Sequence, residues 1–437
     1  MTAFRSLPAP PDLLSVHASE PARWPFLLDS ASEGGRLSQF SMLLRAADEP
    51  PIVAGEEPFL PRLAEALRKG AGPTPENLAF EGGWFVYLGY ELAAEIEPRL
   101  PRPPAPDRLP TAYARRCRGG VVVDRATGCA TAFAEDDDEL DRVLGELAAA
   151  GQREASGDPV LPELELQAEP GQRYLDGVRH VRECIAAGDV YQVNLSRAWT
   201  GRCAGAIDSG RLYRRLTQAN PAPFAGLARL PGGTILSSSP ERLVSVRDGR
   251  AQTRPIAGTR PRGRSESRDR ELSDELLGHP KERAEHVMLI DLERNDLGRV
   301  CRSGSVEVDE LMVVESYAHV HHIVSNVRGT LRDGVGPAEV IAAVFPGGTI
   351  TGCPKVRCME IIAALERQGR SFYTGSMGYV GRDGSMDLNI LIRSMLVDDD
   401  RLTFRTGAGI VADSDPEAEL RETEAKAEGL LRALTDA

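Results

Sequence analysis

Apolar positions along the chain repeat with two periods that alternate irregularly. Apolar runs and alternating apolar positions predict strands at residues 24–28, 119–123, 130–134, 190–195, 234–237, 320–327, 374–380 and 386–397, and a strand followed by the start of a helix at residues 82–92. Apolar residues at helical spacing predict helices over residues 58–69, 138–150, 174–187, 272–292 and 418–434. Many strands separated by helices of unequal length favour an α+β fold with large antiparallel sheets over regular βαβ winding.

The segment from Gly151 to Gly171 interrupts this pattern with proline, glycine, serine and acidic residues. Such a composition is typical of a linker or an exposed crossover. A chain of 437 residues is also longer than a typical single core supports. We therefore expect an N-terminal subdomain over residues 1–165 and a second domain over residues 166–437.

Residues 253–263 combine two prolines, two glycines and three arginines. Pro255 and Pro261 fix φ and remove backbone donors, while Gly258 and Gly263 permit conformations that other residues avoid. We therefore expect an irregular loop of defined shape that contacts a ligand, since loops of this kind often carry function. The alternative is a surface connection with solvated arginines.

Charge and cysteine content narrow the classes of function. The formal net charge of −13 gives the chain no general attraction for nucleic acid or for anionic membranes. Seven scattered cysteines, an odd number, indicate reduced thiols rather than a disulfide framework. Residues 1–23 lack the apolar run of a signal peptide, and no stretch reaches the length of a membrane span. These features predict a cytoplasmic protein that binds neither nucleic acid nor a membrane.

Two pairs of glutamates stand three residues apart on predicted helices: Glu282 with Glu285, and Glu419 with Glu422. This spacing projects both carboxylates of a pair from one helix face. An isolated acidic pair is most often a solvated surface. Four carboxylates that converge, in contrast, repel one another unless a hard cation lies between them, and Mg²⁺ prefers oxygen ligands.

Two glycine-rich segments offer backbone amides to an anion. Residues 346–355 enter a predicted helix but lack the spacing of a nucleotide phosphate loop. Residues 406–409 follow a strand and shortly precede the acidic helix that carries Glu419. We therefore expect the helix that carries Glu419 to bind a metal and the loop before it to bind a carboxylate. His322 precedes the apolar Ile323, where a functional and a structural histidine are equally open interpretations.

Taken together, these motifs resemble the chorismate-utilising enzyme family. From about residue 174 to residue 434, six motifs occur in the family's order: Tyr-Gln-Val-Asn-Leu-Ser at 191–196, Ser-Ser-Pro-Glu-Arg at 238–242, Pro-Ile-Ala-Gly-Thr at 255–259, Asp-Leu-Glu-Arg-Asn-Asp-Leu-Gly-Arg at 291–299, Gly-Gly-Thr-Ile-Thr-Gly-Cys-Pro-Lys at 347–355 and Gly-Ile-Val-Ala-Asp-Ser-Asp-Pro at 409–416. The resemblance implies antiparallel sheets packed as a sandwich with surrounding helices, as in anthranilate synthase component I. It makes residues 166–437 the chorismate-binding catalytic domain.

The resemblance also implies roles for the residues that match these motifs. Glu285 and Glu422 bind Mg²⁺, with Glu282 and Glu419 beside it, and the ion clamps the ring carboxylate of chorismate. Glu241 is the implied general acid and base, with His322 and Thr349 close to the reacting ring. The other implied substrate contacts are the site wall at Ala257, Gly258 and Thr259, the ring-carboxylate site at Gly407, Ala408, Gly409 and Lys426, and the enolpyruvyl-carboxylate site at Tyr373 and Arg393.

Two positions bear on the nucleophile. Water-using relatives carry a lysine base where this chain has Gln192, and a neutral amide cannot deprotonate water, so ammonia is the expected nucleophile. Ala257 stands where aminodeoxychorismate synthases typically have a nucleophilic lysine and where anthranilate synthases have alanine. Residues 84–92, 191–196, 220–224 and 350–352 nevertheless resemble the aminodeoxychorismate branch. We predict aminodeoxychorismate synthase component I, which aminates carbon 4 in 4-aminobenzoate and folate biosynthesis, with anthranilate synthase component I as the alternative.

The remaining predictions concern partners and regulation. The sequence carries no glutaminase signature, so ammonia from glutamine requires a separate glutamine amidotransferase subunit, and an aminodeoxychorismate lyase consumes the product. Leu28, Asp29 and Ser30 resemble the effector segment of the family, which makes the N-terminal subdomain a candidate tryptophan site. A third interpretation is a catalytically inactive protein that keeps the fold and binds tryptophan or chorismate.

Overall fold

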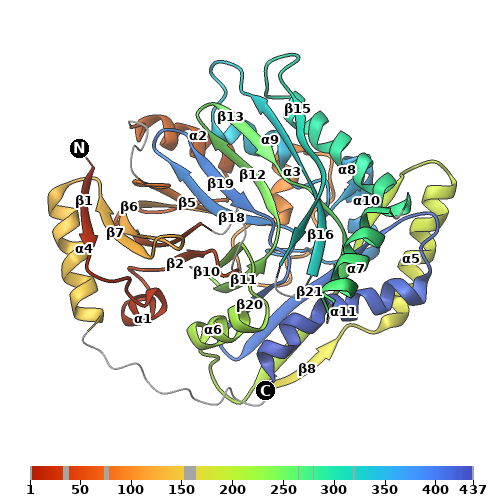
Figure 1. The fold of residues 1–437 in the computed structure, drawn as a ribbon, viewed down its shortest axis with the longest axis horizontal. Helices are drawn as coiled ribbons and strands as arrows, with labels where there is room; N and C mark the ends of the chain where they lie inside the picture. The colour runs from red at the N-terminus through yellow and green to blue at the C-terminus, as the bar shows by residue number, and fades with distance from the viewer. Residues whose placement is uncertain are drawn as a thin grey trace.

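The computed structural model describes residues 2–32, 39–72, 78–151, 164–263, 265–278, 280–317 and 320–435, with the backbone alone for Thr259, Pro261, Pro280 and Lys281. All strand pairings between the named strands of this part of the chain are antiparallel, and the strands of both halves join one hydrogen-bonded network. The predicted α+β fold with large antiparallel sheets is confirmed. The helices surround these sheets (Figure 1).

The N-terminal part is a layer of strands with α4 on its outer side (Figure 1). Asp136 caps α4 by accepting the N–H of Glu139 at 2.9 Å, and Leu140 and Val143 bury its inner face. The elements of this part are β1 (Ala3–Leu7), α1 (Leu13–Ser19), β2 (Phe26–Asp29), β3 (Phe40–Ala46), β4 (Ile52–Val53), α2 (Phe59–Lys69), β5 (Gly83–Leu88), a 3-10 turn η1 (Tyr90–Leu92), α3 (Ala93–Ile96), β6 (Ala112–Asp124), β7 (Cys129–Ala134) and α4 (Asp137–Ala150).

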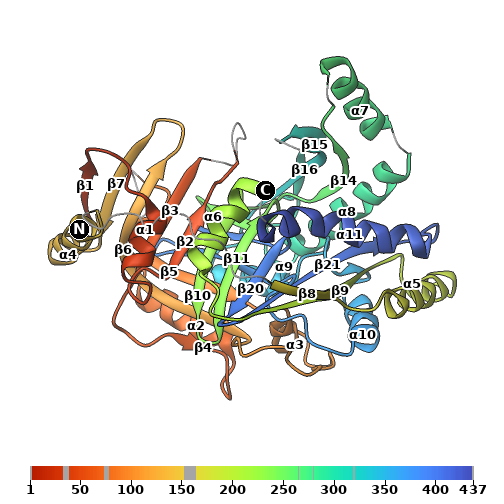
Figure 2. The same cartoon turned by 90° about the horizontal axis from the view of Figure 1, so that it is seen from below.

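The C-terminal part contributes most of the helices that surround the sheets (Figures 1 and 2). Its elements are β8 (Leu164–Ala168), α5 (Gly171–Ala186), β9 (Gln192–Cys203), α6 (Ser209–Ala219), β10 (Phe224–Leu230), β11 (Gly233–Ser239), β12 (Arg242–Arg247), β13 (Arg250–Thr253), β14 (Ile256–Pro261), α7 (Glu266–Gly278), α8 (Pro280–Gly298), β15 (Glu307–Ser316), β16 (Val320–Thr330), α9 (Pro337–Val344), β17 (Gly352–Cys353), α10 (Lys355–Glu366), β18 (Ser376–Gly381), β19 (Met386–Asn389), β20 (Ser394–Asp398), β21 (Arg401–Ile410) and α11 (Pro416–Leu434).

Strands connect the two parts directly. β2 pairs with β10, and β5 pairs with β18, so the sheet continues across the predicted division of the chain. The boundary after residue 165 falls inside β8, which pairs with β9. The linker predicted over residues 151–171 lies mostly outside the described residues, and its last part forms β8 and the start of α5. The division into two domains stays a prediction.

Three elements differ from the sequence prediction. Residues 253–263 are not an irregular loop, because β14 pairs with β16 and absorbs Gly258 as a bulge with φ of 67°. The predicted helix over 272–292 is two helices, α7 and α8, and α7 projects from the body (Figure 2). The strand predicted over 386–397 is broken between β19 and β20, where Arg393 adopts φ of 50°. The bulge at Gly258 and the left-handed residue Arg393 both belong to the candidate site.

Candidate active site

Glu241 lies in the tight turn between β11 and β12, and only 5% of its surface is exposed. The Glu241 N–H donates to the Ser239 hydroxyl at 3.2 Å, and the Ile390 N–H donates to the Glu241 carbonyl at 3.0 Å. Burial raises the pKa of the Glu241 carboxyl to about 7, although the Thr349 hydroxyl and the Ile256 backbone act in the opposite direction. Such a carboxyl exists in both protonation states near neutral pH, which suits general acid–base catalysis.

Arg393 places a positive charge near this carboxyl. Its φ of 50° lies in the left-handed region that residues other than glycine rarely adopt. The charges of Arg393 and Lys426 both act to lower the pKa of Glu241. Burial lowers the pKa of Arg393, and its guanidinium makes no hydrogen bond or ion pair with any residue in the described ranges. A partly buried guanidinium without a partner among the described residues is suited to bind an anion.

The wall formed by β14 and β16 holds a neutral histidine. His322 is 2% exposed, and burial together with the charge of Arg393 lowers the pKa of its ring to about 3. In the register of the two strands, Thr259 lies opposite His322, and Ala257 lies opposite Ile323. The side chain of Thr259 lies outside the described structure. A neutral imidazole here can donate or accept a hydrogen bond without adding charge to the site.

The strand pair β9–β21 forms a second wall in which glycine permits close packing. A Cβ at Gly407 would lie 2.9 Å from the Tyr373 hydroxyl, and a Cβ at Gly409 would lie 2.1 Å from Nε2 of Gln192. Gln192 is 8% exposed, and its Oε1 has no hydrogen bond partner within the described structure. Lys426 of α11 reaches this wall and donates to the Gly407 carbonyl at 3.0 Å. Ala408 is buried between the two glycines.

The four glutamates predicted to surround Mg²⁺ lie on α8 and α11 as expected. Within the described part of the chain, no three His, Cys, Asp or Glu side chains are placed to hold a metal ion. Instead, Glu282 pairs with Arg260 at 3.3 Å, and Glu422 pairs with Lys426 at 2.7 Å. Burial raises the pKa of the Tyr174 phenol, and the charges of Glu419 and Glu422 raise it further.

Gly258 brings one of these carboxylates to the wall of the site. A Cβ at Gly258 would lie 2.9 Å from Oε2 of Glu282, so glycine at this bulge lets α8 approach β14. The donors on both helices are carboxylate oxygens, the ligand type that Mg²⁺ prefers. The residues present therefore suit this ion in chemistry and in spacing along each helix.

The candidate effector residues border a separate cavity of about 180 Å³. Leu28, Asp29 and Ser30 line it together with residues of β10, β12 and β18. Asp29 accepts a hydrogen bond from Ser41 at 2.6 Å and forms an ion pair with Arg125 at 3.3 Å. These three residues line a cavity, and their role as an effector site stays a prediction.

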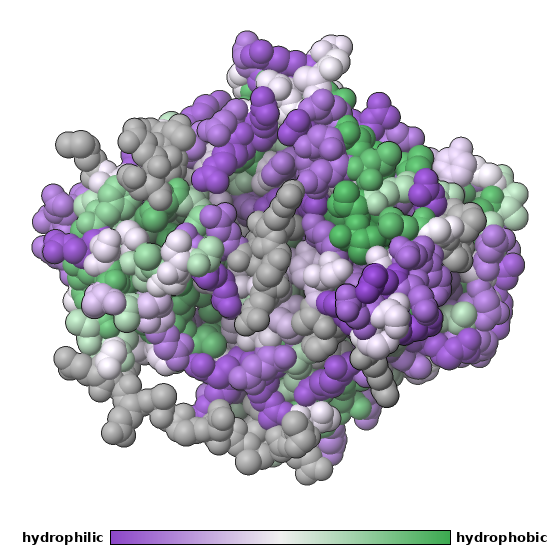
Figure 3. All heavy atoms as spheres, viewed as in Figure 1, coloured by the Kyte–Doolittle hydropathy of each residue, from purple (hydrophilic) through white to green (hydrophobic). Residues whose placement is uncertain are grey.

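A larger cavity of about 900 Å³ lies between α3, α8 and α10 and borders Tyr191, the neighbour of Gln192. Its rim includes two of the exposed apolar residues, Tyr191 at 70% and Val287 at 48% exposure. In Figure 3 hydrophobic residues reach the surface over α7 and α8, on the face shown in Figure 1. None of the residues that the sequence assigned to catalysis lines this cavity among its described lining residues.

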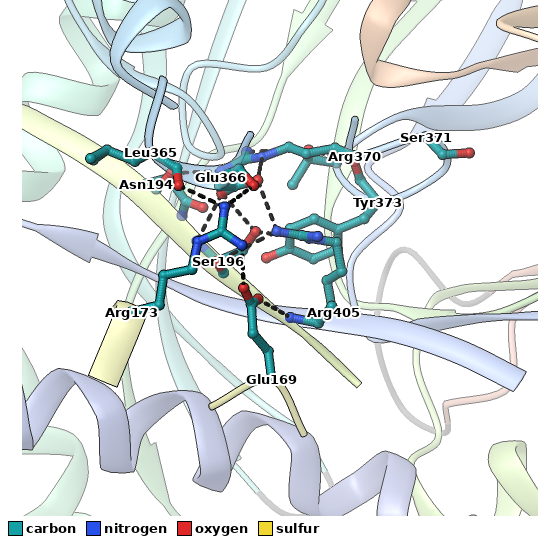
Figure 4. A network of polar contacts seen from close by, with 12 residues as sticks. Glu169, Arg173, Asn194, Ser196, Leu365, Glu366, Arg370, Ser371, Tyr373 and Arg405 are labelled. Atoms are coloured by element: carbon teal, nitrogen blue, oxygen red, sulfur yellow. Dashed lines mark hydrogen bonds and ion pairs between the residues drawn. The ribbon is translucent and has the colours of Figure 1, made fainter. Parts of the chain in front are cut away.

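Two groups of buried polar residues were missed in the sequence. Glu366 joins Arg370 and Arg405 in an ion-pair network beside the β9–β21 wall (Figure 4). Only Glu366 and Arg370 are close in sequence, so spacing gives no sign of the third member. Glu293 is 6% exposed and lies near Glu241, and no role was predicted for it from its motif at residues 291–299.

The chain matches the family described as chorismate binding enzyme over residues 25–432 and belongs to that family. A protein of Synechocystis sp. named anthranilate synthase component I-like protein is 45% identical over 362 residues, which are 82% of this chain and 74% of that protein. Aminodeoxychorismate synthase component 1 of Bacillus subtilis is 48% identical over 261 residues, which are 60% of this chain and 55% of that protein.

A solved structure shows the same fold. Anthranilate synthase component I from Streptococcus pneumoniae aligns with a TM-score of 0.79 at 28% identity, over 90% of this chain and 92% of that chain. The predicted family and its fold are therefore confirmed. The chain is an enzyme that acts on chorismate, of the type that includes anthranilate and aminodeoxychorismate synthases. None of its described helices is long and apolar enough to cross a membrane.

Proposed function

We propose that this enzyme is aminodeoxychorismate synthase component I, which replaces the hydroxyl at carbon 4 of chorismate with ammonia. The observation that carries the choice of ammonia is Gln192, whose buried Oε1 lacks a hydrogen bond partner among the described residues and whose Nε2 lies against Gly409. A neutral amide cannot deprotonate water, whereas its oxygen can accept an N–H of ammonia. Ammonia also needs no deprotonation before it attacks.

The reaction follows from the two protonation states of Glu241. The protonated carboxyl donates its proton to the hydroxyl at carbon 4, which leaves as water. Ammonia forms the new carbon–nitrogen bond at that carbon, and the Glu241 carboxylate then accepts a proton from the resulting ammonium group. The products are 4-amino-4-deoxychorismate and water, and Glu241 returns to its starting state. A pKa of about 7 lets the same group perform both steps near neutral pH.

Chorismate is a dianion, and the site offers separate positive groups for its two carboxylates. The guanidinium of Arg393, with the buried hydroxyl of Tyr373, would hold the enolpyruvyl carboxylate. Lys426 and the amides at residues 407–409 would hold the ring carboxylate. Mg²⁺, when bound by Glu285 and Glu422 with Glu282 and Glu419 beside it, would supply further positive charge to the ring carboxylate. His322, Thr349 and the wall at Ala257, Gly258 and Thr259 would border the ring.

Anthranilate synthase component I is the second candidate, and Ala257 favours it. The alanine offers no amine that could add covalently to the ring, and relatives from Synechocystis and Streptococcus carry anthranilate synthase names. The four regional likenesses to the aminodeoxychorismate branch, and the 48% identity to the B. subtilis protein over 261 residues, support amination at carbon 4.

The product distinguishes the two candidates. Purified protein is incubated with chorismate, Mg²⁺ and ammonium, and aminodeoxychorismate lyase is then added. We expect 4-aminobenzoate to appear only after the lyase. Anthranilate as the sole aromatic product would reject the proposal in favour of the second candidate. A matched reaction with Glu241→Gln, in which product should form about 10²- to 10⁴-fold more slowly, shows that turnover belongs to this site.

We further propose that a separate glutamine amidotransferase subunit supplies the ammonia. Glutamine should support turnover only when such a subunit is added, while ammonium should support turnover by this chain alone. Glutamine-dependent turnover by the isolated chain would contradict this part of the proposal.

A candidate tryptophan effect through Leu28, Asp29 and Ser30 is tested in the same assay. Tryptophan should inhibit the wild type and leave an Asp29→Asn variant less affected.

A further inference from the structure

A third cavity, of about 530 Å³, lies along the β9–β21 strand pair beyond the wall of the candidate active site. At the site wall, Gly407 pairs with Ser196. Two residues further along the strands, Arg405 pairs with Ala198, and both of these residues line the cavity. Because alternate residues of a strand point to one face, the cavity continues the face that forms the site wall. Its described lining residues include none of those assigned above to the substrate, metal or effector sites.

The end of the cavity next to the site wall carries an arginine with a free donor. Arg405 is 7% exposed, and its Nε donates to the Ser196 hydroxyl at 3.1 Å. Its Nη2 donates to Glu366 at 2.9 Å (Figure 4). Its Nη1 makes no hydrogen bond with a residue in the described ranges. An ionised carboxylate is the strongest acceptor for such a donor, so this end of the cavity is suited to a carboxylate.

The opposite end of the cavity is acidic. The turn between β20 and β21 begins at Asp398, and Asp398, Asp399 and Asp400 all line the cavity there. Arg108 pairs with Asp398 at 2.5 Å, and Arg401 also lines this end. The three aspartates outnumber the two arginines, and the Asp400 carboxylate makes no hydrogen bond or ion pair with a described residue. This end is therefore suited to accept an N–H group from a ligand.

Apolar side chains lie between the two ends. Leu396 and Phe372 line the cavity and are 2% and 3% exposed, and Thr403 faces the cavity from β21. Arg401 and Arg405 stand four residues apart on β21, which corresponds to about 13 Å at the usual rise of an antiparallel strand. The amine and carboxylate of an α-amino acid lie too close together to serve both ends. A ring between the two groups brings them closer to this separation and suits the apolar middle of the cavity.

We propose that this cavity is a second ligand site, for a small aromatic carboxylate whose amine lies opposite the carboxylate, the class to which 4-aminobenzoate belongs. The carboxylate accepts from Nη1 of Arg405, the ring lies against Leu396 and Phe372, and the amine donates to Asp400. The inference rests on the proposed function in one respect, namely that 4-aminobenzoate is the compound to which amination at carbon 4 leads. Binding itself requires no turnover.

Isothermal titration calorimetry of the purified chain, without chorismate or ammonia, tests the chemistry of the ligand. The probes are 4-aminobenzoate, 2-aminobenzoate and aniline. We expect 4-aminobenzoate to bind and the other two to bind at least about 10-fold more weakly. In 2-aminobenzoate the amine cannot reach the acidic end, and aniline has no carboxylate for Arg405. Equal affinity for all three probes, or no binding of 4-aminobenzoate, would overturn the proposal.

A substitution that fills the cavity tests its position. Thr403→Leu places a larger side chain in the middle of the cavity and should weaken binding of 4-aminobenzoate about 10-fold or more. Thr131→Leu, at a half-buried threonine of β7, is the matched control and should bind like wild type. Unchanged affinity in Thr403→Leu would overturn the proposal.

A second variant keeps the test decisive if Thr403→Leu does not fold. Asp400→Asn removes one negative charge without filling the cavity. It should weaken binding of 4-aminobenzoate about 10-fold and leave binding of benzoate unchanged, because benzoate has no amine. Asp333→Asn, at a side chain with 94% exposure, is the control and should bind both probes like wild type. Equal affinity of wild type and Asp400→Asn for 4-aminobenzoate would contradict the assigned orientation and overturn the proposal.

Arg393→Met distinguishes this cavity from the proposed chorismate site. Because Arg393 lies outside the cavity, the variant should bind 4-aminobenzoate like wild type. Binding that is lost in Arg393→Met but kept in Thr403→Leu would place the probe in the chorismate site and overturn the inference. The titrations remain informative if anthranilate proves to be the product, so failure of the proposed function is distinguishable from failure of this inference.

Discussion

Two buried glutamates, Glu366 and Glu241, have opposite pKa shifts because their surroundings differ. Burial alone would raise the pKa of Glu366, but the charges of Arg370 and Arg405 outweigh burial and lower it. Arg370 approaches one carboxylate oxygen at 2.7 Å and Arg405 the other at 2.9 Å, with a further hydrogen bond from Ser196 at 2.8 Å (Figure 4). Around Glu241 burial dominates instead, and the pKa rises to about 7.

The difference in surroundings distinguishes Glu366, a structural group, from Glu241, the proposed catalytic group. The network around Glu366 satisfies its own charges and ties α10 to β9 and β21. At the candidate active site, the guanidinium of Arg393 and the Gln192 oxygen have no partners among the described residues. Leaving buried polar groups unsatisfied costs stability, so a fold retains them where a ligand supplies the missing partner.

Removing the titratable proton of Glu241 should have the largest effect on catalysis. Glu241→Gln should lower kcat by about 10²- to 10⁴-fold, the usual contribution of a general acid or base. Steady-state kinetics with chorismate and ammonium measures the loss. The control is Glu183→Gln, at a side chain that is 77% exposed, and it should leave kcat unchanged. Activity within a few fold of wild type in Glu241→Gln would show that another group supplies the proton.

Glu366→Gln should affect stability instead of chemistry. Removing one partner of a buried ion network leaves Arg370 and Arg405 uncompensated, and we expect a loss of about 3–5 kcal/mol in the free energy of unfolding. Denaturant unfolding measures this loss. Glu360→Gln on the same helix, with 32% side-chain exposure, should cost far less. Equal losses in the two variants would mean that the network does not act as described.

Arg393→Met should weaken substrate binding while the fold persists. A hydrogen bond to a charged group contributes about 1.5–3 kcal/mol, so KM for chorismate should rise about 10- to 100-fold. Arg421→Met, at an exposed position of α11, is the matched control and should leave KM unchanged. A KM that does not change in Arg393→Met would remove this residue from the substrate site.

The raised pKa of Glu241 should also make the stability of the protein depend on pH, and this is the smallest effect that we expect. Because the pKa of Glu241 is raised on folding, the folded state keeps a proton that the unfolded chain loses between about pH 4.5 and about pH 7, so stability falls as pH rises through this window. Glu241→Gln should therefore be more stable than wild type above pH 7, by about 1–3 kcal/mol. Thermal unfolding at several pH values tests the sign, and a variant less stable than wild type at all pH values would refute it.

Local motifs were sufficient to propose site residues, whereas the predicted elements were wrong where the tertiary structure overrides local preference. The motifs contain Glu241 and Gln192, and the family resemblance extended the predicted site to Lys426, which donates to the Gly407 carbonyl in the structure. The pattern from 386 to 397 predicted a continuous strand, because its apolar alternation gives no sign of the left-handed residue at Arg393.

Residues 253–263 show the opposite failure. Their prolines and glycines predicted an irregular loop, yet pairing with β16 draws them into a strand with one bulge. Arg405 reaches Glu366 from a distant segment, and the charge of Glu241 acts on Glu293 from another, and spacing within one sequence does not reveal such contacts. The convergence of four glutamates on one metal is also a long-range property and stays a prediction.

The most direct test asks whether chorismate supplies partners for Arg393 and Gln192 at the candidate active site. Thermal unfolding of wild type, Arg393→Met and Arg421→Met is followed with increasing chorismate in the presence of Mg²⁺ and without ammonia. A ligand that binds only the folded state raises Tm as its concentration passes Kd. We expect Tm to rise in wild type and in Arg421→Met and to rise much less in Arg393→Met. An unchanged Tm in wild type, or an equal rise in all three proteins, would contradict the account.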